Sequence, residues 1–500
     1  MNSSLRVNIT NLASERFSGV VDMSASETRF PKLDTAISAG LLLAVAFTAL
    51  AHGAVEPWSV AVFELIVLAL GLLWAIKSVA DKRIRLTVPA ALVPVAALVV
   101  FGLAQSVSLT DESGGRASLS VDVEATRSAV TVLFFVLASA LIAANFYKTR
   151  EGVKRLLIFL VVFGLALAVF GLIQHFTWDG RLYWLRPTAR REVFGPFVNR
   201  NHFAGYMEML IFIPAALIVT GGVRRDLRLF YGFAAAMMGL ATVVSLSRGG
   251  MIGMLAGMLF LAAMSYGVRT RDGQTENEAG GRPQISPSAG VAVRAGAVGA
   301  IALTIVAGTI WIGADPVIGR LAQTVQQADA TSAPDYNRNW IWKDTLSMIA
   351  ANPLTGVGLG AYQTAYSRYA STNGSLIVAQ SHNDYLQVLA DGGIIGGALA
   401  LWFIVALFRG LVRGVRSRDP LLRAAALGGG AGAVAILVHS VFDFNLQLPS
   451  NALLFLCIAA VASRAGASSG RPRSISVEPG PHDESADDHV AVVGRAAHTQ

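Results

Sequence analysis

The chain has 500 residues, of which 54% are hydrophobic and only 14% are charged, and its formal net charge at pH 7 is +8. Because soluble domains carry roughly 25% charged residues, this composition excludes a string of ordinary water-soluble domains and indicates an integral membrane protein. The single cysteine, Cys457, excludes an intrachain disulfide.

A mostly polar segment, residues 1–34, is followed by about twelve apolar runs. A helix needs about 20 mostly apolar residues to cross a bilayer. The runs lie near 35–55, 57–76, 88–106, 128–146, 156–177, 202–221, 229–246, 250–267, 294–313, 393–409, 423–441 and 449–463. We therefore predict an all-α membrane domain over residues 35–463, with about 12 transmembrane helices. The first run is too long for the apolar part of a signal peptide, so we expect it to be retained.

Basic residues follow every even-numbered run. Examples are Lys77, Lys82, Arg83 and Arg85 after the second run, and Lys148, Arg150, Lys154 and Arg155 after the fourth. Such loops are typical of the cytoplasmic side, which predicts that both termini are cytoplasmic. Topology thus explains the positive charge, and we expect no nucleic-acid partner. The polar tail, residues 464–500, is predicted to be disordered.

Five arginines break this pattern in the outward-facing segment 178–201. They are Arg181, Arg186, Arg190, Arg191 and Arg200. Arginine keeps its charge and binds phosphate oxygens with paired hydrogen bonds, so the cluster could hold an anionic lipid-linked substrate. Lipid headgroups or an ion pair with Glu192 explain it equally well. We predict substrate-binding roles for Arg190, Arg191 and Arg200, and for the adjacent Asn201 and His202.

Arg248 lies in the sequence Ser245–Gly250, between two apolar runs. An arginine there is costly unless it is paired or lines a wet cavity, and the neighbouring glycines let the backbone approach an anion. The alternative is a snorkelling arginine at a tight turn, and we favour the functional reading. Glu64 and Glu208 fall within predicted spans and are weaker candidates by the same argument. Glu208 could point into the same cavity as His202.

Residues 314–392, called the long loop below, are too many for a simple connector and predict a small, mostly helical extramembrane unit. Arg338 opens a helix-like stretch and could contact a second phosphate, although a solvated arginine beside interfacial tryptophans is equally consistent. The glycines of 352–360 are spaced GxGxG, which is not a dinucleotide fingerprint, and predict a flexible turn.

His382 stands before the tenth apolar run, within Ser381–Tyr385. A histidine can accept a proton near neutral pH, as a general base must, and Asn383 or Asp384 could orient it. A surface histidine without a role is the usual alternative. The sequence shows none of the paired His and Cys spacings that bind zinc.

Taken together, these elements resemble the O-antigen ligase/polymerase superfamily of bacterial envelope glycosyltransferases, with the resemblance centred on residues 194–397. It is carried by FVNRNHFAG at 197–205, SLSRGG at 245–250, NPLTGVGLGAY at 352–362, SHNDYLQVLADGGIIGG at 381–397 and the segment His439–Pro449. The ligases' H[NSQ]-x9-GxxG motif is met by His382–Asn383 and Gly393–Gly396. Their R-x3-L motif is met by Arg338 with Trp342 in the place of leucine.

The resemblance implies a metal-independent, inverting glycosyl transfer without a cofactor, at the periplasmic face of a bacterial inner membrane. The donor would be a glycan on undecaprenyl pyrophosphate, and the acceptor would be a lipid A-core, a growing lipopolysaccharide or exopolysaccharide chain, or a protein. Arg248 and Arg338 would clamp the pyrophosphate, His382 would take the acceptor proton, and we expect Asn383 to bind substrate. The alternative is a transporter of lipid-linked sugars or anionic solutes, although the polar motifs gather on one side of the chain rather than at the midplane.

Overall fold

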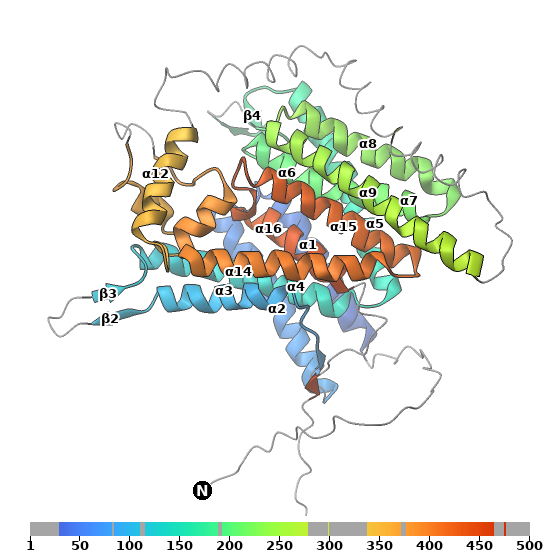
Figure 1. Cartoon of the computed structure of the whole chain (residues 1–500), viewed down its shortest axis with the longest axis horizontal. Coiled ribbons are helices and arrows are strands. Elements are labelled where there is room, and N and C mark those ends of the chain that lie inside the picture. Colours follow the sequence, from blue (N-terminus) through green and yellow to red (C-terminus); the bar gives the residue numbers. More distant parts are fainter. Residues whose placement is uncertain are drawn as a thin grey trace, which may run out of the picture.

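The computed structural model of the chain describes residues 30–82, 85–110, 116–188, 193–278, 299, 338–371, 377–464 and 475–476. These residues form an all-α protein with only short strand pairs (Figure 1). The strands are β1 (Arg85–Leu86), β2 (Ser108–Thr110), β3 (Arg116–Ser118), β4 (Arg181–Leu182), β5 (Arg186–Pro187) and β6 (Ile475–Ser476). β1 pairs with β6, β2 with β3 and β4 with β5, all antiparallel.

Nine helical stretches in the described part of the chain are long and apolar enough to cross a membrane. They are α1 (Pro31–Leu50), α2 (Pro57–Ala80), α4 (Val123–Phe146), α5 (Arg150–Phe176), α6 (Arg200–Leu210) with α7 (Phe212–Thr220), α8 (Arg228–Val244), α9 (Arg248–Glu278), α14 (Asp384–Val415) and α15 (Pro420–His439). Two shorter apolar helices are α3 (Leu92–Gln105) and α16 (Pro449–Arg464). The prediction of an all-α membrane protein is confirmed. The predicted span 294–313 lies outside the described residues.

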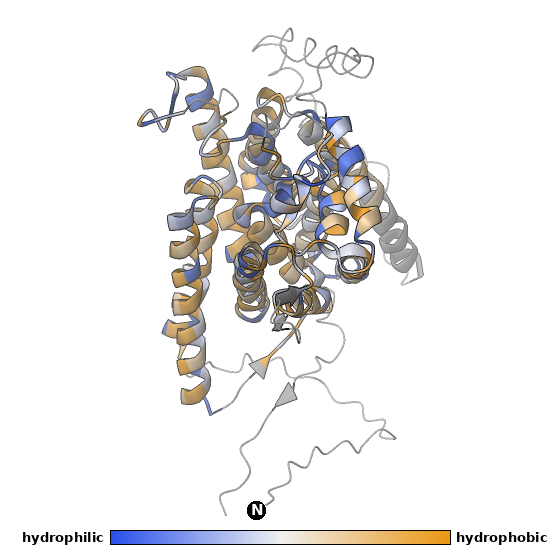
Figure 2. Ribbon diagram, turned by 90° about the vertical axis from the view of Figure 1, so that its left-hand side faces the viewer, coloured by the Kyte–Doolittle hydropathy of each residue, from blue (hydrophilic) through white to orange (hydrophobic). Residues whose placement is uncertain are grey.

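Hydrophobic residues dominate the long helices (Figure 2). α15 lies among α6, α7, α9, α14 and α16. Its glycines permit this close packing: a Cβ added to Gly432 would lie 2.8 Å from the backbone oxygen of Met209. Close approach through small residues is typical of helix contacts in membranes, where lipid offers no hydrophobic drive for helix association. α15 therefore links most of the helices that carry the predicted site.

The described part of the long loop contains α12 (Arg338–Ala351) and α13 (Tyr362–Tyr366), which lie at one end of the bundle (Figure 1). The predicted span 393–409 proves to be part of a longer helix, because Asn383 caps α14: its side-chain oxygen accepts hydrogen bonds from the backbone N–H groups of Tyr385 and Leu386. Residue 393, the predicted start of the span, is instead the site of a break within α14, where Gly393 has a φ of 58° and a ψ of −154°.

The glycine-rich segment of the long loop fills this break. Val357 and Gly358 donate backbone hydrogen bonds to the carbonyls of Ala390 (2.9 Å) and Asp391 (3.0 Å). Gln105 of α3 adds a bond to the Asp391 carbonyl at 3.0 Å. The carbonyl groups that the break would leave unpaired are thus satisfied, as burial requires. The segment 352–360, predicted as a flexible turn, is thus hydrogen-bonded to α14 beside Gly393, the first glycine of the GxxG motif.

Candidate active site

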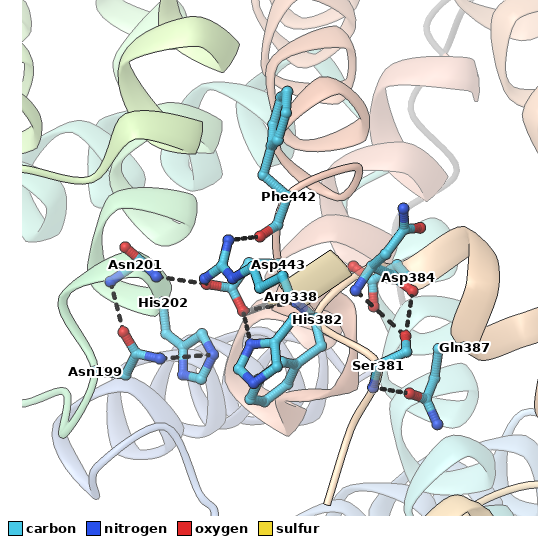
Figure 3. Close-up of polar contacts among 12 residues, drawn as sticks. Asn199, Asn201, His202, Arg338, Ser381, His382, Asp384, Gln387, Phe442 and Asp443 are labelled. Carbon is cyan, nitrogen blue, oxygen red and sulfur yellow. Dashed lines mark hydrogen bonds and ion pairs between the residues drawn. The ribbon is translucent and has the colours of Figure 1, made fainter. Parts of the chain in front are cut away.

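Three of the predicted site residues meet at a carboxylate that the sequence did not single out. Asp443 lies in the turn 440–444, which follows the end of α15 and precedes the 3₁₀ helix η3 (Asn445–Gln447). Its carboxylate receives a 2.5 Å hydrogen bond from Asn201 of α6, lies 3.3 Å from Nδ1 of His382, and pairs at 3.5 Å with Nη2 of Arg338 (Figure 3). Asp443 therefore joins α6, α12 and the start of α14.

Asp443 is completely buried, yet its surroundings favour the charged form. Burial alone would raise the pKa of its carboxyl. The hydrogen bond with His382 and the positive charges of His202 and Arg338 outweigh this effect and hold the pKa of Asp443 well below its usual range. An ionised carboxylate only accepts hydrogen bonds, so Nδ1 of His382 must be the donor. In the neutral imidazole, Nε2 then carries the free lone pair.

His382 occupies a strained position that its neighbours fix. Its φ is +54°, in the left-handed region that few residues other than glycine adopt. The preceding Ser381 is held at both backbone groups. Its N–H donates to Gln387 at 2.8 Å (Figure 3). Its carbonyl accepts from the indole of Trp342 at 3.0 Å. The tryptophan that replaces the expected leucine of the R-x3-L motif thus supports the backbone beside His382.

His202 lies on the other side of the same turn. The ring of Phe444 stands edge-on between two imidazoles, with centroid distances of 4.8 Å to His202 and 4.9 Å to His382. His202 is only 7% exposed, and its Nε2 lies 3.5 Å from the amide nitrogen of Asn199. A contact between His202 and substrate stays a prediction, since this side chain is buried and packs against Phe444.

Arg338, the first residue of α12, has a side chain that is 41% exposed. One terminal nitrogen donates to the backbone carbonyl of Phe442, and the other faces Asp443. The guanidinium is therefore anchored to the turn while part of it stays accessible to a ligand. It lies beside His382 with Asp443 between them (Figure 3).

Arg248 begins α9 and is half-buried. Leu246, two residues earlier, has a φ of +56°, and Ser247 accepts a hydrogen bond from the N–H of Gly250 at 3.2 Å. The hydroxyl of Ser247 lies 3.5 Å from Nε2 of His439, four residues before Asp443. The segment of Arg248 is thus connected to the turn through His439.

The remaining predicted residues differ in what the structure says of them. Arg200 is the first residue of α6, next to Asn201, while Arg190 and Arg191 lie outside the described residues. Asn383 is 8% exposed and uses its oxygen to cap α14, so a substrate contact stays a prediction for its amide nitrogen. Elsewhere in the arginine cluster, Arg186 forms an ion pair with Glu56.

No metal site is evident in the described ranges, since no three His, Cys, Asp or Glu side chains gather there in a way that could hold an ion. Charge at the site is supplied instead by arginine, histidine and one buried carboxylate. The signal that could have revealed Asp443 is that it is the only acidic residue in the stretch 439–449.

Comparison with known protein families gives a match over a segment that includes part of this site. The family model described as O-Antigen ligase matches residues 233–401, a range that includes Arg248, Arg338 and His382. No match was found among curated proteins. This match covers the helices and motifs around His382, and it supports the resemblance of the chain to the O-antigen ligase/polymerase superfamily.

Proposed function

We propose that the chain transfers a glycan from undecaprenyl pyrophosphate to an acceptor hydroxyl at the periplasmic face of a bacterial inner membrane. The match to the O-antigen ligase model supports the coarser role of a membrane glycosyltransferase in polysaccharide assembly. The observation that carries the proposal is that the buried carboxylate of Asp443 contacts both His382 and the accessible Arg338. This arrangement has the parts that a glycosyl transfer needs: a base, a group that orients it, and a cation for the leaving group.

His382 is the proposed base. Its Nδ1–H donates to Asp443, which fixes the tautomer and leaves Nε2 to accept the proton of the acceptor hydroxyl. The acceptor oxygen attacks the anomeric carbon as the bond from that carbon to the pyrophosphate oxygen breaks. The electron pair of that bond leaves with the pyrophosphate. Attack from the face opposite the leaving group inverts the anomeric configuration.

Arg338 and Arg248 are proposed to bind the pyrophosphate. One more negative charge develops on the pyrophosphate as it leaves, and in a partly buried site this charge needs compensation, which fixed guanidinium groups provide without rearrangement. Arg338 is held on the Asp443 turn, and Arg248 stands at the start of α9, where backbone N–H groups also favour an anion. In this proposal the reaction uses neither metal nor cofactor.

A transporter of lipid-linked sugars is the second candidate, because α14 is broken at Gly393 and broken helices often form binding sites in transporters. In this chain, however, the carbonyls of Ala390 and Asp391 at the break are already occupied by backbone N–H groups and by Gln105. That arrangement supports a structural use of the break, and we favour the transferase.

The experiment that separates the two candidates uses the full chain in liposomes. Undecaprenyl pyrophosphate carrying a short labelled glycan is supplied with one acceptor at a time: lipid A-core, a soluble oligosaccharide or a peptide. The transferase predicts covalent transfer of the label with release of undecaprenyl pyrophosphate, and the active acceptor identifies the subfamily. Movement of intact labelled lipid across the bilayer, without any new glycosidic bond, would instead establish the transporter.

A further inference from the structure

A second ionisable pair is buried beneath the proposed site. His439, the last residue of α15, places Nδ1 2.9 Å from Oε1 of Glu208 on α6. Their side chains are 1% and 0% exposed. A buried carboxylate beside an imidazole is costly to maintain in a membrane helix, and the mechanism proposed above does not use it.

One face of α6 contacts the end of α15, the turn 440–444 and η3. Asn201, Gly205 and Glu208 follow an i, i+4, i+7 spacing, which places them on one side of the helix over about 10 Å. Asn201 binds Asp443, and Glu208 binds His439. Between them, a Cβ added to Gly205 would lie 2.4 Å from Oδ1 of Asn445, so this side chain occupies the space that glycine leaves.

The same histidine is enclosed by the segment that carries Arg248. A Cβ added to Gly249 would lie 2.4 Å from Cδ2 of His439, and one added to Gly253 would lie 2.6 Å from Oε2 of Glu208. The backbone carbonyl of His439 accepts hydrogen bonds from the N–H groups of Phe442 (2.8 Å) and Asp443 (3.2 Å). His439 therefore contacts both the start of α9 and the turn that holds the base.

We propose that Glu208 and His439 form a positioning pair, which fixes the turn 440–444 against α6 so that Asp443 holds His382 in its active tautomer. The inference rests on the proposed function, because it concerns how that site is held. Groups that orient a functional histidine from behind it typically change activity by about 10- to 100-fold when they are removed.

The test compares Glu208→Ala, Glu208→Gln and Gly205→Ala in the full chain. With only eight histidines in the sequence, ¹⁵N-labelled imidazoles can be resolved, and His382→Gln assigns the signal of His382. We expect Glu208→Ala to replace the single Nδ1–H tautomer of His382 by a mixture and to lower kcat about 10- to 100-fold, with the KM for the donor changed less than about threefold. Glu208→Gln keeps an acceptor for His439 and should restore most of both properties.

Gly205→Ala provides the second perturbation, because its added methyl group disturbs the same face while alanine favours the helix. The same direction of change is expected. The matched control is Gly71→Ala on α2, where an added Cβ meets no atom within 4 Å, and it should leave both readouts unchanged. If Glu208→Ala does not yield folded protein, Gly205→Ala decides the question.

An unchanged His382 tautomer in the folded variants would overturn the inference, even if activity fell. A rise in KM or a fall in kcat with an unchanged tautomer would point to a general packing defect and would also overturn it. If the wild-type chain transfers no glycan but the tautomer still responds to Glu208→Ala, the positioning pair stands and the proposed function fails.

Discussion

Asp443→Asn removes one charge from the centre of the site with almost no change in volume. The carboxylate accepts from Asn201 at one oxygen and faces His382 with the other. An amide offers one oxygen and one NH₂ group, so it cannot satisfy both donors. If the NH₂ group faces His382, the imidazole must turn its proton to Nε2 and lose its function as a base. If the NH₂ group faces Asn201 instead, it meets the NH₂ group of Asn201, and two hydrogen-bond donors oppose each other in a buried contact.

The expected loss follows from this geometry. A histidine held in the wrong tautomer by the corresponding substitution in serine proteases loses about 10⁴ in kcat. Because Arg338 also loses an ionic partner, we predict a fall of about 10³- to 10⁴-fold, or about 4–5.5 kcal/mol in the activation barrier. The protein should also lose about 1–3 kcal/mol of unfolding free energy through an unsatisfied buried group.

The assay measures single-turnover transfer from labelled undecaprenyl pyrophosphate glycan, with thermal unfolding recorded on the same preparation. Asp419→Asn is the matched control: this aspartate caps the other end of α15, and asparagine is also a good cap, so activity should stay within about threefold. Transfer by folded Asp443→Asn at the wild-type rate would refute the assigned role of the carboxylate.

Three further predictions follow from single observations. Arg338→Lys keeps the charge but loses the planar set of donors that can bind both the turn and a phosphate, so kcat should fall about 10²- to 10³-fold. Wild-type activity in Arg338→Lys would exclude the proposed pyrophosphate-binding role of Arg338. Folding lowers the pKa of Asp443, so the contribution of its charged form to stability is complete above about pH 4 and is lost as the pH falls below that value. The difference in Tm between wild type and Asp443→Asn should therefore shrink on acidification. A difference that stays constant with pH would contradict this. Gly393→Ala should lower the free energy of unfolding by more than about 2 kcal/mol, because the residue has a φ of +58° and an added Cβ would lie 2.4 Å from the backbone of the long loop. Gly392→Ala should be well tolerated, because the nearest atom to its Cβ would be 3.6 Å away. Equal losses in the two variants would show that the break is not the cause.

The membrane helices could be predicted from the sequence because length and hydropathy alone identify a span. Eleven of the twelve predicted runs coincide with described helices, and the twelfth lies outside the described residues. The break at Gly393 could not be predicted, since the motif shows two glycines but not that the first has a positive φ and receives a segment of the long loop.

The site was predicted in part. His382 and Arg338 stand out because their local sequences match known motifs and because charged groups are rare in this chain. Asp443 does not, because its role depends on contacts across 61 residues to His382 and 242 residues to Asn201. Only the packing of α15 against α6 and the long loop brings these groups together. The orientation in the membrane and the substrate contacts of Arg190 and Arg191 stay predictions.

The most direct test of the central claim is a single-turnover measurement of glycan transfer by the purified full chain and by His382→Ala, in the same lipid and with the same donor and acceptor. Loss of a general base typically lowers a rate by about 10²- to 10⁴-fold. We predict a fall of that size in His382→Ala, with donor binding retained through Arg338 and Arg248. Transfer by the folded His382→Ala variant at the wild-type rate would contradict the role of His382 as the base.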